Sequence, residues 1–410
     1  MPSRFFDKFE SVHNVQRILF KGVIDTMKTM KKVMSIVLAV VLCMVCFAGC
    51  KKNSGSDEQT LIIGGSGPLT GDAASYGISV QQGATMAVEE INAAGGVNGI
   101  KLELKFEDDV NDAATAVNAY ATLYDAGMKV SLGTVTSKPC VAVTEEVKKD
   151  GMLMLTPTGS QKECTQYDNC FRVCFMDPDQ GTYAAQFIAD NQVGNKIAIL
   201  YDKSSDYSTG IYENFKAKAG ELNLDIVTEQ AFTDQSKTDF SVQLQAIKSS
   251  GADLLFMPFY YQEAALVITQ AAAADLDVTF FGVDGMDGII AQMGEENADL
   301  TEGIVLLTPF MASSTDEKIA SFVADYEKAY NATPDQFAAD AYDAVYIIKA
   351  AMEQAGIEDV EDKELNEKLV AAMTEIKVEG VTGTMTWSAD GEPTKSAQAV
   401  VIKNGVYEEY

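Results

Sequence analysis

The stretch LIIGGSGPLTGDAASYG, residues 61–77, runs from an apolar strand-like segment into a cluster of glycines and then toward a helix. A strand, a tight turn and a helix in this order form the repeating unit of α/β folds, and nucleotide-binding loops begin in the same way. A P-loop ends in Gly-Lys-Ser/Thr, so that the lysine and the hydroxyl meet phosphate and magnesium. No lysine occurs between Thr60 and Lys101, which argues against a P-loop here.

The glycine spacing also differs from that of a dinucleotide-binding turn, which requires G-x-G-x-x-G. Gly65, Gly67 and Gly71 are spaced G-x-G-x-x-x-G, and Pro68 stands where the helix should open with free N–H groups. We therefore interpret the stretch as a tight turn that brings Tyr76 to the mouth of a cleft, without a phosphate.

The same strand-turn-helix unit recurs along the chain. Strands are expected at 61–65, 101–107, 129–133, 152–155, 195–201, 224–232, 253–258 and 278–282. Amphipathic helices are expected between them at 76–94, 112–126, 139–150, 207–220, 238–250 and 261–274. This alternation predicts parallel sheets with helices on both faces.

A break in the pattern falls at 170–181, CFRVCFMDPDQG, where proline and acids interrupt the alternation as a hinge would. We therefore predict an α/β fold of two Rossmann-like, doubly wound lobes. The remainder changes to long helices near 314–330 and 336–355, and then to a β-rich segment, 383–402. Ligands of such folds gather beyond the carboxyl ends of the strands and between lobes.

Composition excludes several classes of function. The chain has 410 residues, 47% of them hydrophobic, and a formal charge of -29. Residues 1–50 carry a net +4, so the remainder carries about -33, which repels nucleic acid and anionic lipid. The only histidine is His13, and no G-x-S-x-G, H-E-x-x-H or paired C-x-x-C motif occurs. With His13 removed by processing, Ser-His-Asp and Cys-His catalysis and histidine metal sites are excluded. Carboxylate or lysine chemistry stays possible, but no spacing of these residues points to it, so we expect no enzyme, no cofactor and no metal site.

The segment MKKVMSIVLAVVLCMVCFAGC, 30–50, combines a basic start, an apolar run at 33–48 and the tripeptide Ala-Gly-Cys. This three-part form predicts a signal peptide, 1–49, because the run is shorter than the roughly 20 residues of a spanning helix. Small residues before Cys50 resemble the lipobox of bacterial lipoproteins, which implies a lipid on its thiol. The alternative is a buried helix that ends in an incidental cysteine.

The polar stretch that follows Cys50 suits a flexible tether, 50–57. The leader is long for a signal peptide, so translation is expected to begin at Met27 or Met30. Secretion permits disulfides. Cys164 and Cys170 flank the turn-like TQYDN and are expected to pair, whereas Cys140 and Cys174 are expected to be buried thiols.

The segments after the strands hold small hydroxyls and few charges. They are GTVTSKPC (133–140), LTPTGSQ (155–161), YDKSSDYSTG (201–210), PFYYQE (258–263) and GVDGMDG (282–288). Hydroxyls and the free N–H groups of a first helical turn bind carboxylate, and Asp284 offers an acceptor to a cation. Tyr76, Tyr207 and Tyr260 can form aromatic walls. The set favours a receptor for a zwitterion, although serine caps, a solvated turn aspartate and interlobe packing are the alternatives.

Residues 60–410 resemble the type I periplasmic binding proteins of ABC importers, in particular the leucine/isoleucine/valine-binding group. The motifs that carry the resemblance are GPLTGDAASYG (67–77), GATMAVEEINAAGGVNG (83–99), LTPTGS (155–160), DPDQGTYAAQFI (177–188), PDQFAADAYDAV (334–345) and TGTMTWSADGEP (382–393). The resemblance implies two lobes joined by a three-segment hinge. These lobes would be 58–177 plus 310–382 and 178–309 plus 383–410.

The resemblance also assigns roles. Ser137 and Ser160 would bind the ligand's α-carboxylate, Thr158 would offer its backbone carbonyl to the α-ammonium, and Asp284 would pair with that ammonium. The aromatic pocket positions match Tyr76, Tyr207 and Tyr260. Aspartate at 284 is one methylene shorter than the usual glutamate, and Val135 and Thr136 replace residues that shape the side-chain pocket in the family.

The implied function is that of a bacterial, extracytoplasmic receptor with a lipid anchor. It would bind a free amino acid, most favourably one with a branched-chain or aliphatic side chain, and deliver it to a permease and an ATPase. We expect it to be a monomer that does not bind nucleic acid. The alternatives are a receptor for amides, urea or aromatic acids, a sensor that works without transport, and a secreted enzyme on the same fold.

Overall fold

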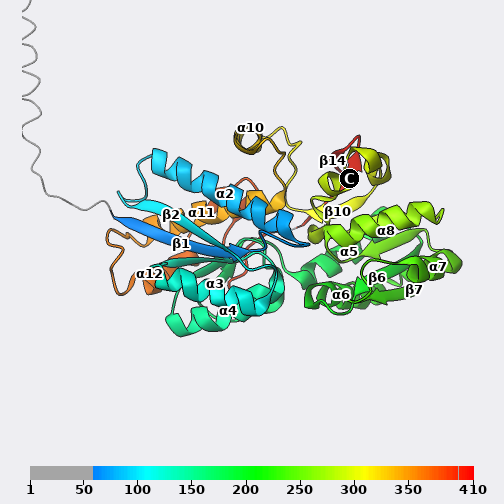
Figure 1. The fold of residues 1–410 in the computed structure, drawn as a ribbon, viewed down its shortest axis with the longest axis horizontal. Coiled ribbons are helices and arrows are strands. Elements are labelled where there is room, and N and C mark those ends of the chain that lie inside the picture. The colour runs from blue at the N-terminus through cyan, green and yellow to red at the C-terminus, as the bar shows by residue number, and fades with distance from the viewer. Residues whose placement is uncertain (1–58, 396) are drawn as a thin grey trace, which may run out of the picture. The chain divides into compact units, whose positions relative to one another are not determined.

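The computed structural model describes residues 59–395 and 397–410, so the expected signal peptide, Cys50 and the whole tether lie outside the described residues. Residues 58–410 form one compact unit, which contains two large β-sheets, each flanked by helices, and a small two-stranded sheet (Figure 1). Within the described residues, no helix is both long and apolar enough to cross a membrane.

The first sheet is entirely parallel, in the order β2-β1-β3-β4-β5. Its strands are β1 (Thr60–Gly67), β2 (Lys101–Asp108), β3 (Val130–Thr134), β4 (Met154–Thr156) and β5 (Cys170–Arg172). The crossover helices are α2 (Ala74–Ala93), α3 (Ala113–Asp125) and α4 (Ser137–Asp150), with the 3-10 turn η1 (Lys162–Thr165) before β5. Strand order reverses beside β1, so a crevice opens beyond the carboxyl ends of β1 and β3.

The second sheet has the order β14-β13-β10-β9-β8-β6-β7 and is parallel from β7 to β10. Its strands are β6 (Lys196–Asp202), β7 (Asp225–Phe232), β8 (Leu254–Met257), β9 (Thr279–Gly282), β10 (Val305–Thr308), β13 (Gln398–Lys403) and β14 (Val406–Glu409). The helices are α5 (Asp177–Asn191), α6 (Asp206–Leu222), α7 (Ser241–Ser250), α8 (Tyr261–Ala273) and α9 (Ile289–Met293), with the 3-10 turns η2 (Asp284–Met286) and η3 (Glu295–Thr301). β13 and β14 close one edge as an antiparallel hairpin.

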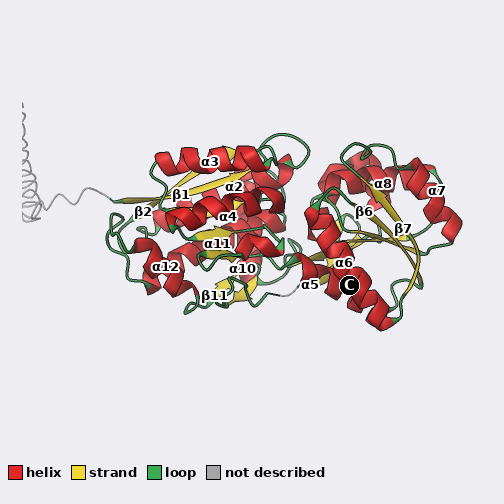
Figure 2. Ribbon diagram, turned by 90° about the horizontal axis from the view of Figure 1, so that it is seen from below, coloured by secondary structure: helices red, strands yellow, loops and turns green. Residues whose placement is uncertain are grey.

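After β10 the chain returns to the first lobe. This return contains α10 (Glu317–Tyr330), α11 (Gln336–Gln354), α12 (Leu365–Met373) and the hairpin of β11 (Val378–Gly380) and β12 (Gly383–Met385). α2 and α11 cover one face of the first sheet, and α3 and α4 cover the other (Figures 1 and 2). The fold is the predicted α/β arrangement of two lobes.

The last crossover between the lobes lies later than expected. Met385 and Trp387 belong to the core of the first lobe, the Trp387 indole donates to the carbonyl of Arg172 at 2.8 Å, and Arg172 N donates to Gly391 O at 3.1 Å. The predicted boundary at 382/383 is therefore corrected to a position between Gly391 and β13. The indole and the strand-end backbone of β5 anchor this segment.

Close packing of α2 on α11 depends on Gly83. A Cβ at this position would lie 2.0 Å from the carbonyl oxygen of Ala338, which is backbone and cannot move aside. We expect Gly83→Ala to lower the free energy of unfolding by about 1–3 kcal/mol, measured by urea denaturation.

Gly220 is the matched control, because it lies in α6 with nothing within 4 Å of a Cβ. Gly220→Ala should raise stability by about 0.4–1 kcal/mol, since alanine loses less backbone entropy on folding. Equal effects at Gly83 and Gly220 would contradict the close-packing argument.

Candidate functional site

All seven residues predicted to bind the ligand line one cavity between the two sheets. Its lining consists of Tyr76, Val135, Thr136, Ser137, Thr158, Ser160, Tyr207, Tyr260, Asp284, Gly285 and Phe337. Each predicted residue follows the carboxyl end of a strand, namely β1, β3 or β4 in the first lobe and β6, β8 or β9 in the second. The free volume at the centre is about 10 Å³, so an amino acid can enter this cavity only if the lobes first open.

The first lobe contributes hydroxyls and a helix N-terminus to the cavity. Ser137 is the first residue of α4, and its Oγ lies 3.4 Å from that of Ser160 and accepts from Gln161 N at 3.2 Å. Thr158 Oγ1 donates to Val135 O at 2.6 Å. Because no side chain caps α4, its first N–H groups and these two serines form a neutral site suited to an anion.

The second lobe contributes one carboxylate. Asp284 is buried, and its Oδ1 accepts from the Tyr207 hydroxyl at 2.5 Å and from Gly285 N at 2.7 Å. Burial raises the pKa of Asp284 to about 6, against the opposing hydrogen bonds from Tyr207, Gln180 and Gly285. The carboxyl therefore lacks a cation, which an ammonium group would supply.

Aromatic rings form the wall between these two polar ends. The Tyr76 hydroxyl donates to Gly285 O and accepts from Tyr261 N at 3.2 Å, so this first-lobe side chain reaches two backbone groups of the second lobe. Its ring centroid lies 5.3 Å from that of Tyr260 and 4.2 Å from that of Phe337. The wall is suited to an apolar side chain.

The sequence reasoning did not identify Phe337 or Gly285 as site residues. Phe337 lies in the motif PDQFAADAYDAV, and it reaches the cavity because α11 begins at the crossover. A Cβ on Gly285 would lie 2.6 Å from the Tyr207 hydroxyl, so only glycine leaves room for the bond between Tyr207 and Asp284.

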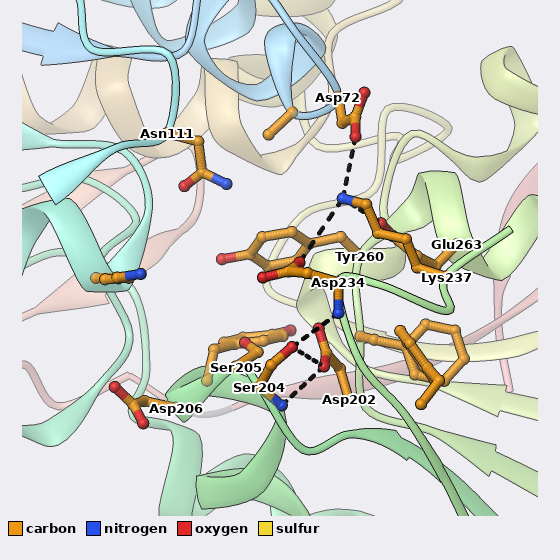
Figure 3. Close-up of a pocket in the computed structure, with 15 residues that line it drawn as sticks. Asp72, Asn111, Asp202, Ser204, Ser205, Asp206, Asp234, Lys237, Tyr260 and Glu263 are labelled. Atoms are coloured by element: carbon orange, nitrogen blue, oxygen red, sulfur yellow. Dashed lines mark hydrogen bonds and ion pairs between the residues drawn. The ribbon is translucent and has the colours of Figure 1, made fainter. Parts of the chain in front are cut away.

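A larger polar pocket of about 220 Å³ adjoins the cavity and shares Tyr207 and Tyr260 with it (Figure 3). Lys237 from the second lobe lies 3.0 Å from Asp72 of the first lobe and 3.4 Å from Glu263. This ion pair crosses between the lobes beside the pocket, where opening would break it.

The predicted disulfide between Cys164 and Cys170 is absent, because all four cysteines within the described residues are free and buried. η1 turns the thiol of Cys164 toward α4, where it donates to Ser137 O at 3.8 Å. The Cys170 thiol lies 4.0 Å from Asn169 Oδ1 at the start of β5. The intervening turn therefore does not direct the two thiols at each other.

No cluster of three or more histidine, cysteine or acidic side chains suited to a metal ion occurs in the described part of the chain.

Comparison with known proteins agrees with this geometry. The profile described as periplasmic binding protein matches residues 60–406. The chain is 31% identical over 356 residues to the Leu/Ile/Val-binding protein homolog 3 of Brucella melitensis, covering 86% of this chain and 94% of the relative. It is 32% identical over 337 residues to the leucine-, isoleucine-, valine-, threonine- and alanine-binding protein of Pseudomonas aeruginosa, covering 82% and 87%.

A similar solved structure is the branched-chain amino acid transporter substrate-binding protein LivJ of Streptococcus pneumoniae in complex with isoleucine. Its TM-score is 0.78 at 28% identity, with 85% of this chain and 98% of that chain covered. The type I fold inferred from the sequence motifs is confirmed. The chain therefore belongs to the periplasmic binding protein family.

Proposed function

We propose that this protein is the extracytoplasmic receptor of an ABC importer and that it binds a free amino acid between its two lobes. The observation that carries the proposal is one cavity with serine hydroxyls on one lobe and a buried carboxylate, Asp284, on the other. A zwitterion that loses its water there needs partners for both charges, and this cavity offers them.

The roles proposed for the individual residues are those that the family resemblance implies, and the chemistry of the side chains is compatible with them. Ser137 and Ser160, with the first N–H groups of α4, hold the α-carboxylate. The α-ammonium is held by the carbonyl of Thr158 and the carboxylate of Asp284. Tyr76, Tyr207 and Tyr260 enclose the side chain, together with Val135 and Phe337. The apolar and aromatic side chains of the cavity lining favour a branched-chain or aliphatic ligand. The two relatives described above, which are leucine-, isoleucine- and valine-binding proteins, favour the same class of ligand.

The energetics agree with a transport receptor. Hydrogen bonds to charged groups contribute roughly 1.5–3 kcal/mol each, and burial of an aliphatic side chain contributes a similar amount. After the cost of association and closure, a net of about -8 kcal/mol corresponds to micromolar affinity. The lobes are proposed to close by a hinge motion. The ligand favours the closed state because contacts from both lobes to the ligand exist only when the lobes meet.

Delivery requires a permease and an ATPase as partners. The Ala-Gly-Cys sequence supports cleavage of the signal peptide before Cys50 and a lipid anchor on its thiol, with residues 50–57 as tether. The receptor is proposed to act as a monomer.

The proposal is tested by a thermal-shift screen of the chain from residue 51, since residues 58–410 form a compact unit by themselves. The probes are the twenty amino acids, amides including urea, and aromatic acids. An aliphatic amino acid at 100 times its dissociation constant should add about 2.7 kcal/mol of stability. Stabilisation by amides or aromatic acids alone would contradict the amino-acid assignment.

A further inference from the structure

A second cavity, of about 500 Å³, lies where the chain crosses between the lobes after β10. Its walls come from the start of α9 and the β13–β14 turn in the second lobe, from the crossover itself, and from α10 and the loop before α11 in the first lobe. We call this cavity the hinge pocket. None of its lining residues lines the ligand cavity or the polar pocket beside that cavity.

The size and the lining of the hinge pocket are those of a small-molecule site. Such sites have volumes of roughly 300–1,000 Å³ and mostly apolar walls with a few polar groups. The apolar wall of the hinge pocket is formed by Ile290, Phe310, Val323, Pro334 and Val406. An apolar molecule that covered this wall would be bound by the hydrophobic effect, because it would remove apolar surface from water.

The charged residues of the lining are all acidic, namely Asp287, Glu327 and Asp335. Asp287 is 2% exposed, and its carboxylate accepts from the Tyr407 hydroxyl at 2.7 Å and from Gln336 N at 2.9 Å. Asp335 accepts from a backbone N–H of α11 at 2.9 Å and from a serine hydroxyl at 2.7 Å. Every donor that the described residues offer to these two carboxylates is therefore a neutral group.

The negative charge of the hinge pocket has no countercharge. Burial raises the pKa of Asp287, and burial together with repulsion by Asp287 raises the pKa of Asp335 to about 7. Capping of α11 accounts for the position of Asp335, which is the N-cap residue of that helix, but it does not balance the charge. Charge complementarity therefore favours a cationic occupant.

The hinge pocket is connected to the ligand cavity through η2 and the first turn of α11. Gln336 donates from its backbone N–H to Asp287 and from its side-chain Nε2 to Asp284 O at 2.6 Å. Asp284 and Phe337 line the ligand cavity, whereas Asp287 and Asp335, a few residues away in the same two segments, line the hinge pocket. A movement of one lobe against the other would therefore change both spaces together.

We propose that the hinge pocket is a second ligand site, which binds a hydrophobic organic cation, that is, an ammonium group on a bulky apolar body. The ammonium pairs with Asp287 and Asp335, and the apolar body covers Phe310, Val323 and Val406. The site does not rest on the proposed function, because its lining is separate from that of the ligand cavity.

Occupation of the hinge pocket is expected to tighten amino-acid binding, and this consequence does rest on the proposed function. A molecule in the hinge pocket contacts both lobes in the arrangement in which Asp284 of one lobe and Ser137 of the other line one cavity. A ligand shifts the protein toward the arrangement that it binds best, so the cation stabilises the arrangement that holds the amino acid. The two ligands then raise each other's affinity by the same factor.

The test is isothermal titration calorimetry at pH 7.5 with the chain from residue 51 and three probes that share one apolar body. Adamantylamine is a cation at this pH, adamantanol is neutral and adamantanecarboxylate is an anion. The amine should bind at one site per chain, at least about tenfold more tightly than the alcohol or the carboxylate, as expected for hydrogen bonds to a charged partner. Absence of amine binding, or equal affinity for the amine and the alcohol, would overturn the proposal.

Two variants locate the site. Asp335→Asn should weaken amine binding about tenfold, because asparagine also caps a helix but carries no charge, whereas Asp112→Asn, the same change at the exposed N-cap of α3, should have no effect. Ala291→Trp should abolish amine binding by filling the hinge pocket, whereas Ala272→Trp at an exposed position of α8 should not. Equal amine binding by the two tryptophan variants would place the site elsewhere. The comparison of amine with alcohol on the unmodified receptor decides the charge preference even if Asp335→Asn does not fold.

A last measurement uses the amino acid that the thermal-shift screen identifies. Saturation with adamantylamine should lower the Kd of that amino acid by about fivefold or more. Competition between the two would place the amine in the ligand cavity and overturn the second site, whereas an unchanged Kd would overturn the coupling alone. If no amino acid binds, the proposed function fails, and the three probes and the variants still decide whether the hinge pocket is a cation site.

Discussion

Asp284→Asn is expected to weaken amino-acid binding by about 2–5 kcal/mol, because the ammonium would be buried without its charged partner. This corresponds to roughly a thirty- to several-thousand-fold increase in Kd. Asparagine has nearly the same shape as aspartate and can keep contact with the Tyr207 hydroxyl and Gly285 N, so the change removes charge with little change in packing. Isothermal titration calorimetry with the best ligand of the screen measures the effect.

The control is Asp299→Asn, which removes one negative charge from an exposed position in η3 of the same lobe. It should leave the affinity unchanged, since net charge alone acts weakly on a neutral zwitterion. Unchanged affinity in Asp284→Asn, with the fold intact, would remove Asp284 from the ligand site.

The second large effect is expected at a buried ion pair whose two residues are not part of the cavity lining. Lys395 and Asp340 form an ion pair with 3% and 2% of their side chains exposed, and Lys395 Nζ also donates to Thr382 Oγ1 at 2.7 Å. Lys395→Met should lower the free energy of unfolding by about 3–5 kcal/mol, because Asp340 would remain buried and uncompensated. Urea denaturation at pH 8 measures the loss.

The pH dependence of this loss distinguishes charge from packing. Burial raises the pKa of Asp340 to about 6 although Lys395 opposes the rise, so removal of the lysine raises this pKa further. The carboxyl is then neutral at pH 5 and ionised at a cost only at higher pH. The destabilisation should therefore be smaller at pH 5 than at pH 8.

Lys403→Met provides the control, because Lys403 and its partner Glu408 are each 47% exposed and lie 3.3 Å apart. An exposed pair contributes at most about 1 kcal/mol. If Lys395→Met were as mild as Lys403→Met, the buried pair would not hold the last crossover against α11.

Local sequence patterns predicted much of the fold. The apolar run at 61–65 lies in β1, the helix expected at 139–150 lies in α4, and the helix expected at 336–355 is α11. These elements have clear periodicity or boundaries. For example, Gly151 ends α4 in the left-handed region with φ of 61°, where glycine is favoured.

Other elements were missed for local reasons. β5 and β10 have only three and four residues, too few for a periodic signal. The helix α5 was interpreted as a break because its first turn contains Pro178, yet proline is tolerated there because it removes an N–H that has no partner within the helix. The disulfide prediction failed because spacing in a turn does not determine the direction of the thiols.

By itself, the sequence determined the strand–helix alternation, the absence of histidine beyond His13 and the hydroxyl, acidic and aromatic residues at the strand ends. Those residues converge because the carboxyl ends of parallel strands lie on one edge of a sheet, which is a consequence of local order along the chain. Only the tertiary structure decided that Trp387 returns to the first lobe and that Lys395 pairs with Asp340. The physical reason is that burial and charge pairing depend on neighbours distant in sequence, whose positions no local periodicity encodes.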